Sequence, residues 1–217
     1  MPQDPSKHGN ALTKKQRRQE ARAGRHQPAI GQLSAEGIVE RGRTLPILEC
    51  LINVGWDHGE MGLVQVVVAR EQSSGHVVFA SYLVDVYCLG VKDTLWKAGY
   101  SRAHYDREKA ERLFARMGGY TVCPPELAHQ MVYQAIDYAA RFGFRPQADF
   151  AISEYLLEPR GTFAEPYALT FGKDGQPLFI AGTHDDAKAI VAQLERTAGP
   201  GNYHYIVSFG GPPDEFV

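Results

Sequence analysis

The segment 81–94 (Ser-Tyr-Leu-Val-Asp-Val-Tyr-Cys-Leu-Gly-Val-Lys-Asp-Thr) gathers reactive side-chain types where an apolar run ends. Asp85, Cys88, Lys92 and Asp93 lie within nine residues around Gly90. Carboxylate, thiol and amine groups beside a glycine at the end of a strand are typical of active sites. The same residues can also form the turn that ends the strand, because short polar side chains cap turns.

The two carboxylates of this segment suggest a metal-assisted hydrolase. Mg²⁺ prefers oxygen ligands, and hydrolases of this type need at least two carboxylates that converge on the ion. Asp85 and Asp93 are candidates for those two, and Asp57 or Glu60 for a third. In this alternative a divalent metal is the cofactor. The competing interpretation makes Asp85 a turn cap and Asp93 a member of an exposed charged pair.

Cys88 is a second candidate for catalysis, as a nucleophile. A reactive thiolate needs a base or a positive neighbour, and Lys92 or a histidine would serve. An unpaired cysteine between Tyr87 and Leu89 is, however, more often a small buried core residue.

The loop Trp56-Asp57-His58-Gly59-Glu60 offers three side chains that can bind a metal or transfer a proton. Carboxylate and imidazole together suit Zn²⁺ or Mn²⁺, so Asp57, His58 and Glu60 are candidate metal ligands. A complete site would need a further ligand from elsewhere, and no recognised metal motif such as HExxH is present. An ordinary polar loop accounts for the same residues.

A row of polar side chains recurs every four residues at His129, Tyr133, Asp137 and Arg141. In a helix this spacing places them on one side. They could edge a cleft, with His129 as the catalytic proton-transfer group. The alternative is the solvated face of an amphipathic helix.

Charge is unevenly distributed along the chain. Residues 1–28 carry seven basic and two acidic side chains, net +5, whereas the remainder has sixteen basic and twenty-three acidic, net −7. A basic arm of this kind can contact phosphates of RNA or DNA, or another acidic surface, and the acidic body can suit a basic protein partner. The alternative is a solvated, disordered tail, or one that folds back on the acidic body. The candidate nucleic-acid-binding residues are Lys14, Lys15, Arg17, Arg18, Arg22 and Arg25.

Composition is that of an ordinary globular protein, with 217 residues, 44% hydrophobic and 22% charged. No apolar run approaches the length of a membrane span, so no membrane partner is expected. Cys50, Cys88 and Cys123 lie far apart and form no CxxC pair, which argues against a disulfide framework and favours a reducing cytoplasm. The N-terminus has no apolar core of a secretory signal.

Alternating apolar residues predict a strand over residues 45–54 and a hairpin of two strands over residues 62–86. By parity, Asp85 shares a face with Phe79 and Leu83, and both faces of this strand are largely apolar, which indicates a central position. A second hairpin is predicted around Asp174-Gly175, joining residues 167–171 to 177–181. Helices are predicted over 106–117, from Pro125 to Phe142, over 148–157, and after an N-cap at Thr183, followed by a strand over 203–209.

The segregated order of these elements favours an α+β fold, a mainly antiparallel sheet with two hairpins packed against three to four helices. The predicted organisation is a disordered basic arm over 1–29, a linker over 30–44, one domain over 45–210 and a tail over 211–217. The segments 83–93 (LVDVYCLGVKD) and 171–182 (FGKDGQPLFIAG) resemble stretches of bacterial proteins of unknown function, some of which carry a cysteine-rich metal-binding tail that this chain lacks. The resemblance covers residues 45–208. The resemblance implies a single bacterial cytoplasmic domain. It suggests neither a particular activity nor any catalytic residue.

Taken together, the sequence favours a soluble cytoplasmic binding or accessory domain, associated with nucleic acid or a ribonucleoprotein through its arm. The alternative is the metal-assisted hydrolase around Asp85 and Asp93. A third hypothesis is a structural adaptor for a basic partner. Convergence of residues 57–60 on Asp85, Cys88 and Asp93 is the geometric feature that separates the hydrolase from the other two.

Overall fold

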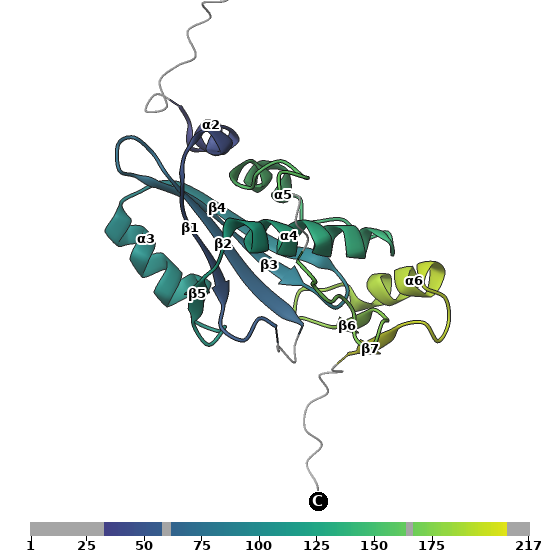
Figure 1. The fold of residues 1–217 in the computed structure, drawn as a ribbon. Coiled ribbons are helices and arrows are strands. Elements are labelled where there is room, and N and C mark those ends of the chain that lie inside the picture. Colours follow the sequence, from purple (N-terminus) through teal and green to yellow (C-terminus); the bar gives the residue numbers. More distant parts are fainter. Residues whose placement is uncertain (1–32, 58–61, 164–166, 208–217) are drawn as a thin grey trace, which may run out of the picture. The chain divides into compact units, whose positions relative to one another are not determined.

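The computed structural model describes residues 33–57, 62–163 and 167–207. The helices and strands from Ala35 onward lie in one compact unit. Its main feature is a five-stranded sheet of order β4-β3-β2-β1-β5, in which every neighbouring pair is antiparallel (Figure 1). The strands are β1 Ile47–Asn53, β2 Leu63–Glu71, β3 Val77–Asp85, β4 Gly90–Tyr100 and β5 Tyr120–Val122.

Helices pack against this sheet, and a second sheet pairs β6 Leu178–Ile180 with β7 His204–Ile206 in parallel. The predicted α+β class is confirmed. None of the helices in the described ranges is long and apolar enough to cross a membrane. The α-helices are α2 Ala35–Glu40, α3 Arg102–Glu108, α4 Pro125–Ala140, α5 Phe150–Ser153 and α6 Ala187–Thr197; η2 Gly42–Thr44 and η4 Glu154–Leu156 are 3-10 turns, and η3 Lys109–Leu113 is a π-helix.

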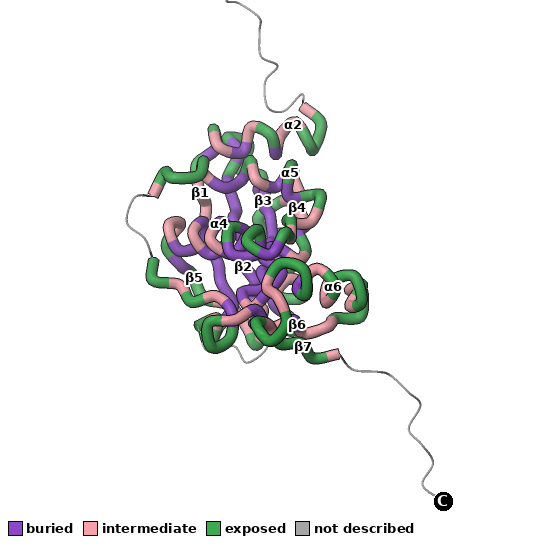
Figure 2. Tube along the Cα trace, turned by 90° about the vertical axis from the view of Figure 1, so that its right-hand side faces the viewer, coloured by how far each residue is buried: buried purple, intermediate pink, exposed green. Residues whose placement is uncertain are grey.

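The predicted hairpin of β2 and β3 forms, and β3 is an interior strand paired with both β2 and β4. Its two faces separate by parity, since successive side chains of a strand point in opposite directions. On one face Phe79 packs with Tyr105 and Phe114. On the other, the Tyr82 hydroxyl donates to the Ser153 carbonyl at 2.8 Å, beneath α5. Because both faces are covered, β2 and β3 are buried over almost their whole length (Figure 2).

The helix predicted over 106–117 is only partly right. The α-helix begins earlier, at Arg102, and from Lys109 the chain widens into η3, where the Phe114 N–H donates to the Lys109 carbonyl at 3.2 Å. Two interactions accompany this wider turn. The Lys109 ammonium lies 2.7 Å from a Glu49 carboxylate oxygen, and Phe114 enters the core under the sheet.

The second predicted hairpin is wrong. The Asp174-Gly175 turn does form, closed by a bridge between Lys173 and Gln176, but residues 167–171 form no strand. The strand that follows the turn, β6, takes β7 as its partner instead. The Ala181 N–H continues that pairing and donates to the Ile206 carbonyl at 2.9 Å. The sheet still contains two hairpins, because β3 and β4 form the other.

Two boundaries also differ from the sequence prediction. Residues 35–44, assigned to a linker, form α2 and η2, because Val39 supplies a fully buried side chain that ties them to the domain. The N-cap of α6 is Asp186, whose side chain accepts the Ala189 N–H at 3.0 Å, and not Thr183. The long helix predicted from Pro125 is confirmed as α4.

The smaller sheet and α6 are joined to the main sheet by an apolar cluster. Phe179 of β6 and Leu194 of α6 pack there with Cys88, Tyr138 and Phe142. An ion pair adds to this junction, since Lys92 of β4 lies 2.5 Å from Asp185, just before α6. The loop over residues 182–185 is thereby held beside the start of β4.

Candidate functional site

Asp85, the first candidate from the sequence, ends β3 and is 5% exposed. One oxygen of its carboxylate accepts the backbone N–H groups of Tyr87 and Cys88, both at 2.9 Å. Burial raises the pKa of Asp85 to about 6, although these two hydrogen bonds and nearby Lys92 act to lower it. This geometry is that of a turn cap, which was the competing interpretation of Asp85 in the sequence analysis.

Cys88 and Asp93 are also engaged locally. The Cys88 side chain is fully buried in the cluster with Phe179, and burial raises the pKa of its thiol far above the ordinary range, so a thiolate does not form near neutral pH. These surroundings match the core interpretation of Cys88. Asp93 is exposed, and its carboxylate accepts the N–H of the next residue, Thr94, at 2.8 Å.

His129 is buried between two backbone groups. Its Nε2 accepts the Glu158 N–H at 2.6 Å, so the ring proton sits on Nδ1, which donates to the Pro125 carbonyl at 2.6 Å. Burial lowers the pKa of His129 to about 4. Both ring nitrogens are therefore occupied in a neutral tautomer, which leaves no position for proton transfer to a ligand.

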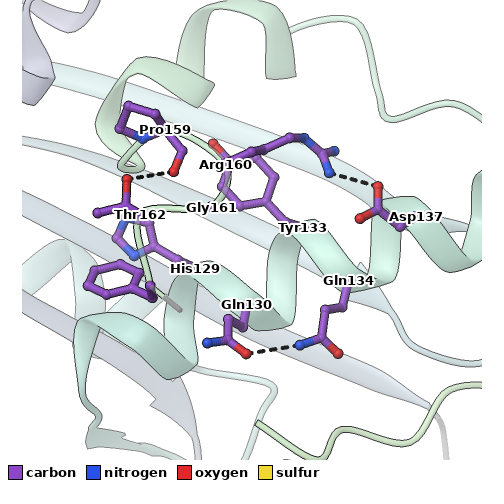
Figure 3. A pocket seen from close by; sticks show the side chains of 10 residues that line it. His129, Gln130, Tyr133, Gln134, Asp137, Pro159, Arg160, Gly161 and Thr162 are labelled. Atoms are coloured by element: carbon purple, nitrogen blue, oxygen red, sulfur yellow. Dashed lines mark hydrogen bonds and ion pairs between the residues drawn. The ribbon is translucent and has the colours of Figure 1, made fainter. Parts of the chain in front are cut away.

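Three members of the polar row on α4, His129, Tyr133 and Asp137, do edge a cavity of about 240 Å³ against residues 159–163 (Figure 3). Its polar groups satisfy one another. Arg160 lies 2.7 Å from Asp137 and its guanidinium stacks over the Tyr133 ring, whose hydroxyl donates to the Glu158 carbonyl. Arg141 lies outside this cavity and stacks on Tyr138. The row holds the segment 158–163 against α4.

The candidate metal ligands fall only partly within the described residues. Asp57 lines a cavity of about 460 Å³ with Tyr87 and Lys173, whereas His58 and Glu60 lie outside the described residues. Among residues 33–57, 62–163 and 167–207, no group of three or more His, Cys, Asp and Glu side chains is placed to hold a metal ion. Also outside the described residues are Lys14, Lys15, Arg17, Arg18, Arg22 and Arg25.

A larger cleft, of about 710 Å³, lies over the end of the sheet where β1 and β3 end and β2 and β4 begin. We call it the sheet-end cleft. Leu63, Gln65 and Leu83 line it from the two central strands. They share one face, because Gln65 lies directly opposite Leu83 in the ladder and Leu63 is two residues away. This face is the one that α3 and η3 cover further along the sheet.

The sheet-end cleft is bounded on two sides. One wall comprises residues 112–117 at the end of η3, which stand on the β5 side because Phe114 packs on Tyr120. The other wall is the loop over 182–185, which stands on the β4 side because Asp185 pairs with Lys92. Because β5 and β4 are the two outermost strands, the walls face each other across the sheet.

Cationic groups come to the sheet-end cleft from both walls. Lys92 is paired with Asp185, whose same oxygen also accepts the Gly182 N–H at 2.8 Å. Arg112 lies 2.9 Å from Glu108, yet its side chain is 67% exposed. Arg116 is exposed and forms no ion pair or hydrogen bond with any described residue. The cleft therefore has one uncompensated guanidinium and a second that remains open to solvent.

Sequence reasoning identified Lys92 but missed the rest of this cleft. Two signals were present. Gln65 is a polar residue within a run of β-branched side chains, and Arg112 and Arg116 are spaced four apart, which places them together on a helical surface. Neither signal shows that the two segments meet, because their meeting depends on the packing of η3 over the sheet.

Comparisons with family profiles, with curated proteins and with solved structures found no match to this chain. The class that the fold defines is an α+β domain built on an antiparallel sheet. The assignment of a site within it rests on the geometry of the described residues.

Proposed function

We propose that this protein is a binding domain whose sheet-end cleft holds a small organic ligand. The observation that supports the proposal is a cleft of about 710 Å³ on the sheet face that α3 and η3 cover only in part, lined by leucines and by cationic side chains. Ligand sites are mostly apolar hollows of roughly 300–1,000 Å³ with a few polar groups. A π-helix borders it, and such turns are frequent at functional sites.

Binding is favoured over hydrolysis because the candidate catalytic groups are already engaged. Asp85 and His129 hydrogen-bond backbone groups, and Cys88 is buried in an apolar cluster. In the sheet-end cleft itself, Asp185 is held by Lys92 and by a backbone N–H. A metal-assisted hydrolase would need converging carboxylates, and the described residues supply no such group.

A neutral aliphatic probe tests this proposal without reference to charge. We expect 1-octanol, titrated into the full chain, to produce saturable amide shift changes by NMR at Leu63, Leu83 and Met117. Leu83→Trp should fill the cleft and abolish these changes. The matched control is Leu95→Trp, a half-buried leucine on β4 that lines a different cavity. Val54→Trp is a second blocking variant at a site already 56% exposed, where unfolding is not expected.

Unchanged shifts in both blocking variants, or shifts centred on another part of the molecule, would contradict the proposal. The far-ultraviolet circular dichroism of each variant confirms that the fold is intact before the comparison is made.

We also propose that residues 1–28 associate with nucleic acid, in a bacterial cytoplasm. The support is the charge contrast between an arm of net +5 and a remainder of net −7. Contacts of this kind are electrostatic, independent of base sequence and weakened by salt. The three free, buried cysteines fit a reducing compartment.

Replacing the six arm residues between Lys14 and Arg25 with glutamine tests this second proposal. We expect fluorescence anisotropy at low salt to show binding of a labelled single-stranded RNA by the native chain and its loss in the variant. Deleting residues 1–28 should have the same effect. If both variants bind RNA as the native chain does, the arm is not a nucleic-acid site.

A further inference from the structure

We propose that the occupant of the sheet-end cleft is an aliphatic anion, with its chain on the leucine floor and its carboxylate or phosphate at the arginines. This inference rests on the proposed function, because it names the class of ligand for the same cleft. Three features of the described residues support it, which are the kind of apolar surface, the placement of charge, and the contrast with the rest of the molecule.

The apolar surface of the cleft is aliphatic throughout. It consists of Val54, Leu63, Leu83, Leu113 and Met117, and no Phe, Tyr or Trp is among its lining residues. Bases and other flat rings are normally held by stacking on aromatic side chains. A flexible alkyl or acyl chain needs only apolar contact, and methionine adapts well to such chains. The lining therefore favours an aliphatic chain over a nucleobase.

The charges of the cleft favour an anion. Three cationic side chains, Lys92, Arg112 and Arg116, line it with a single carboxylate, that of Asp185, and the Glu108 carboxylate pairs with Arg112 from outside the lining. Asp185 and Lys92 satisfy each other, which leaves the guanidinium of Arg116 without an ion-pair partner among the described residues. Arg112, whose side chain is 67% exposed, lines the same wall. A planar guanidinium binds a carboxylate or phosphate through two parallel hydrogen bonds.

This cationic surface is set in an acidic body. The chain beyond residue 28 has net charge −7. A cluster of arginines beside an apolar floor thus runs against the overall charge, and it would repel a cationic ligand while attracting an anionic one. Met117 and Leu113 place apolar surface directly beside the two arginines, as an amphipathic anion requires.

The test compares two ligands of equal chain length, octanoate and 1-octanol, by isothermal titration of the full chain at pH 7.5. We expect octanoate to bind one to one and about fivefold or more tightly than 1-octanol. The double variant Arg112→Gln/Arg116→Gln should remove that preference and leave the affinity for 1-octanol within about twofold. High salt should weaken octanoate alone, because the arginines are exposed.

The matched control is Arg107→Gln, an exposed arginine on α3 that does not line the cleft, and it should leave the preference intact. Because the basic arm could also attract anions, the same titration is made on the chain lacking residues 1–28, where the preference should persist. If the double variant keeps the native preference, or if the arm deletion removes it, the inference is overturned. The proposed function is judged separately, by 1-octanol. If Leu83→Trp abolishes 1-octanol binding, the proposed function stands even when the inference fails. If Leu83→Trp leaves 1-octanol binding unchanged, both are overturned.

Discussion

At the scale of single residues, the side chains with the most reactive groups form hydrogen bonds to the backbone. Asp85 caps the turn after β3, and His129 joins α4 to the segment that begins at Glu158. Both are buried, and burial moves their pKa values in opposite directions, that of Asp85 up to about 6 and that of His129 down to about 4. A perturbed pKa is often a mark of a functional site, but structural burial produces the same shift.

Asp85→Asn tests the cost of the buried carboxylate. The pKa of Asp85 is raised in the folded state, so its stabilising contribution is complete below about pH 4 and is lost as pH rises through about 6. Asparagine keeps the acceptor oxygen without the charge. We expect the variant to be more stable than the native chain by roughly 3 kcal/mol at pH 7.5, with the difference vanishing below about pH 4. Urea denaturation across this range measures it, and a pH-independent difference would contradict the assignment.

His129→Ala tests the opposite dependence. The pKa of His129 is lowered in the folded state, so the native chain loses stability as pH falls from about 6.5 towards 4, when the ring must be protonated. We expect the variant to be less stable by about 2–4 kcal/mol at pH 7.5, because the Glu158 N–H loses its acceptor, and the gap to narrow on acidification. Denaturation midpoints at pH 7.5 and pH 4.5 provide the measurement. A gap that widens with acid would show that His129 is charged when folded.

At the scale of elements, local signals were sufficient where one segment decides the outcome. Pro125 begins α4 and the alternating residues of β2 and β3 form their hairpin, as the periodicity predicts. The predictions that were wrong concern segments whose structure depends on contacts with residues far away in the sequence. Residues 167–171 lack a strand because β6 pairs with β7, and η3 adopts a π-turn in which Lys109 reaches Glu49. The sheet-end cleft is of the second kind, since its floor and walls come from separate parts of the chain.

Gly90→Ala tests the close approach between the β3–β4 turn and α4. Gly90 has φ 70°, and a Cβ there would lie 2.9 Å from the Ala135 carbonyl oxygen of α4. We expect a loss of roughly 3 kcal/mol or more, from backbone strain and the displacement of α4 together. The matched control is Gly75→Ala, with φ 78° and no atom within 4 Å, which should cost only about 1 kcal/mol. Equal losses in the two variants would show that α4 does not press on this turn.

At the scale of the whole molecule, the sheet is covered on one face by α2, α4 and α5 and only in part on the other by α3 and η3 (Figure 1). The uncovered end of the second face is where the walls of residues 112–117 and 182–185 stand. No helix or strand of the described residues fills this end of the sheet face. A ligand with an aliphatic chain and an anionic group would match the leucines and arginines that line it.

The central claim, that this cleft is the binding site, is tested most directly by an amide shift map of the full chain titrated with octanoate. We predict saturable changes grouped at Leu63, Leu83, Arg116 and His184, which lie far apart in the sequence and meet at the sheet-end cleft. Changes confined to residues 1–28, or centred on the cavity beside His129, would contradict the claim.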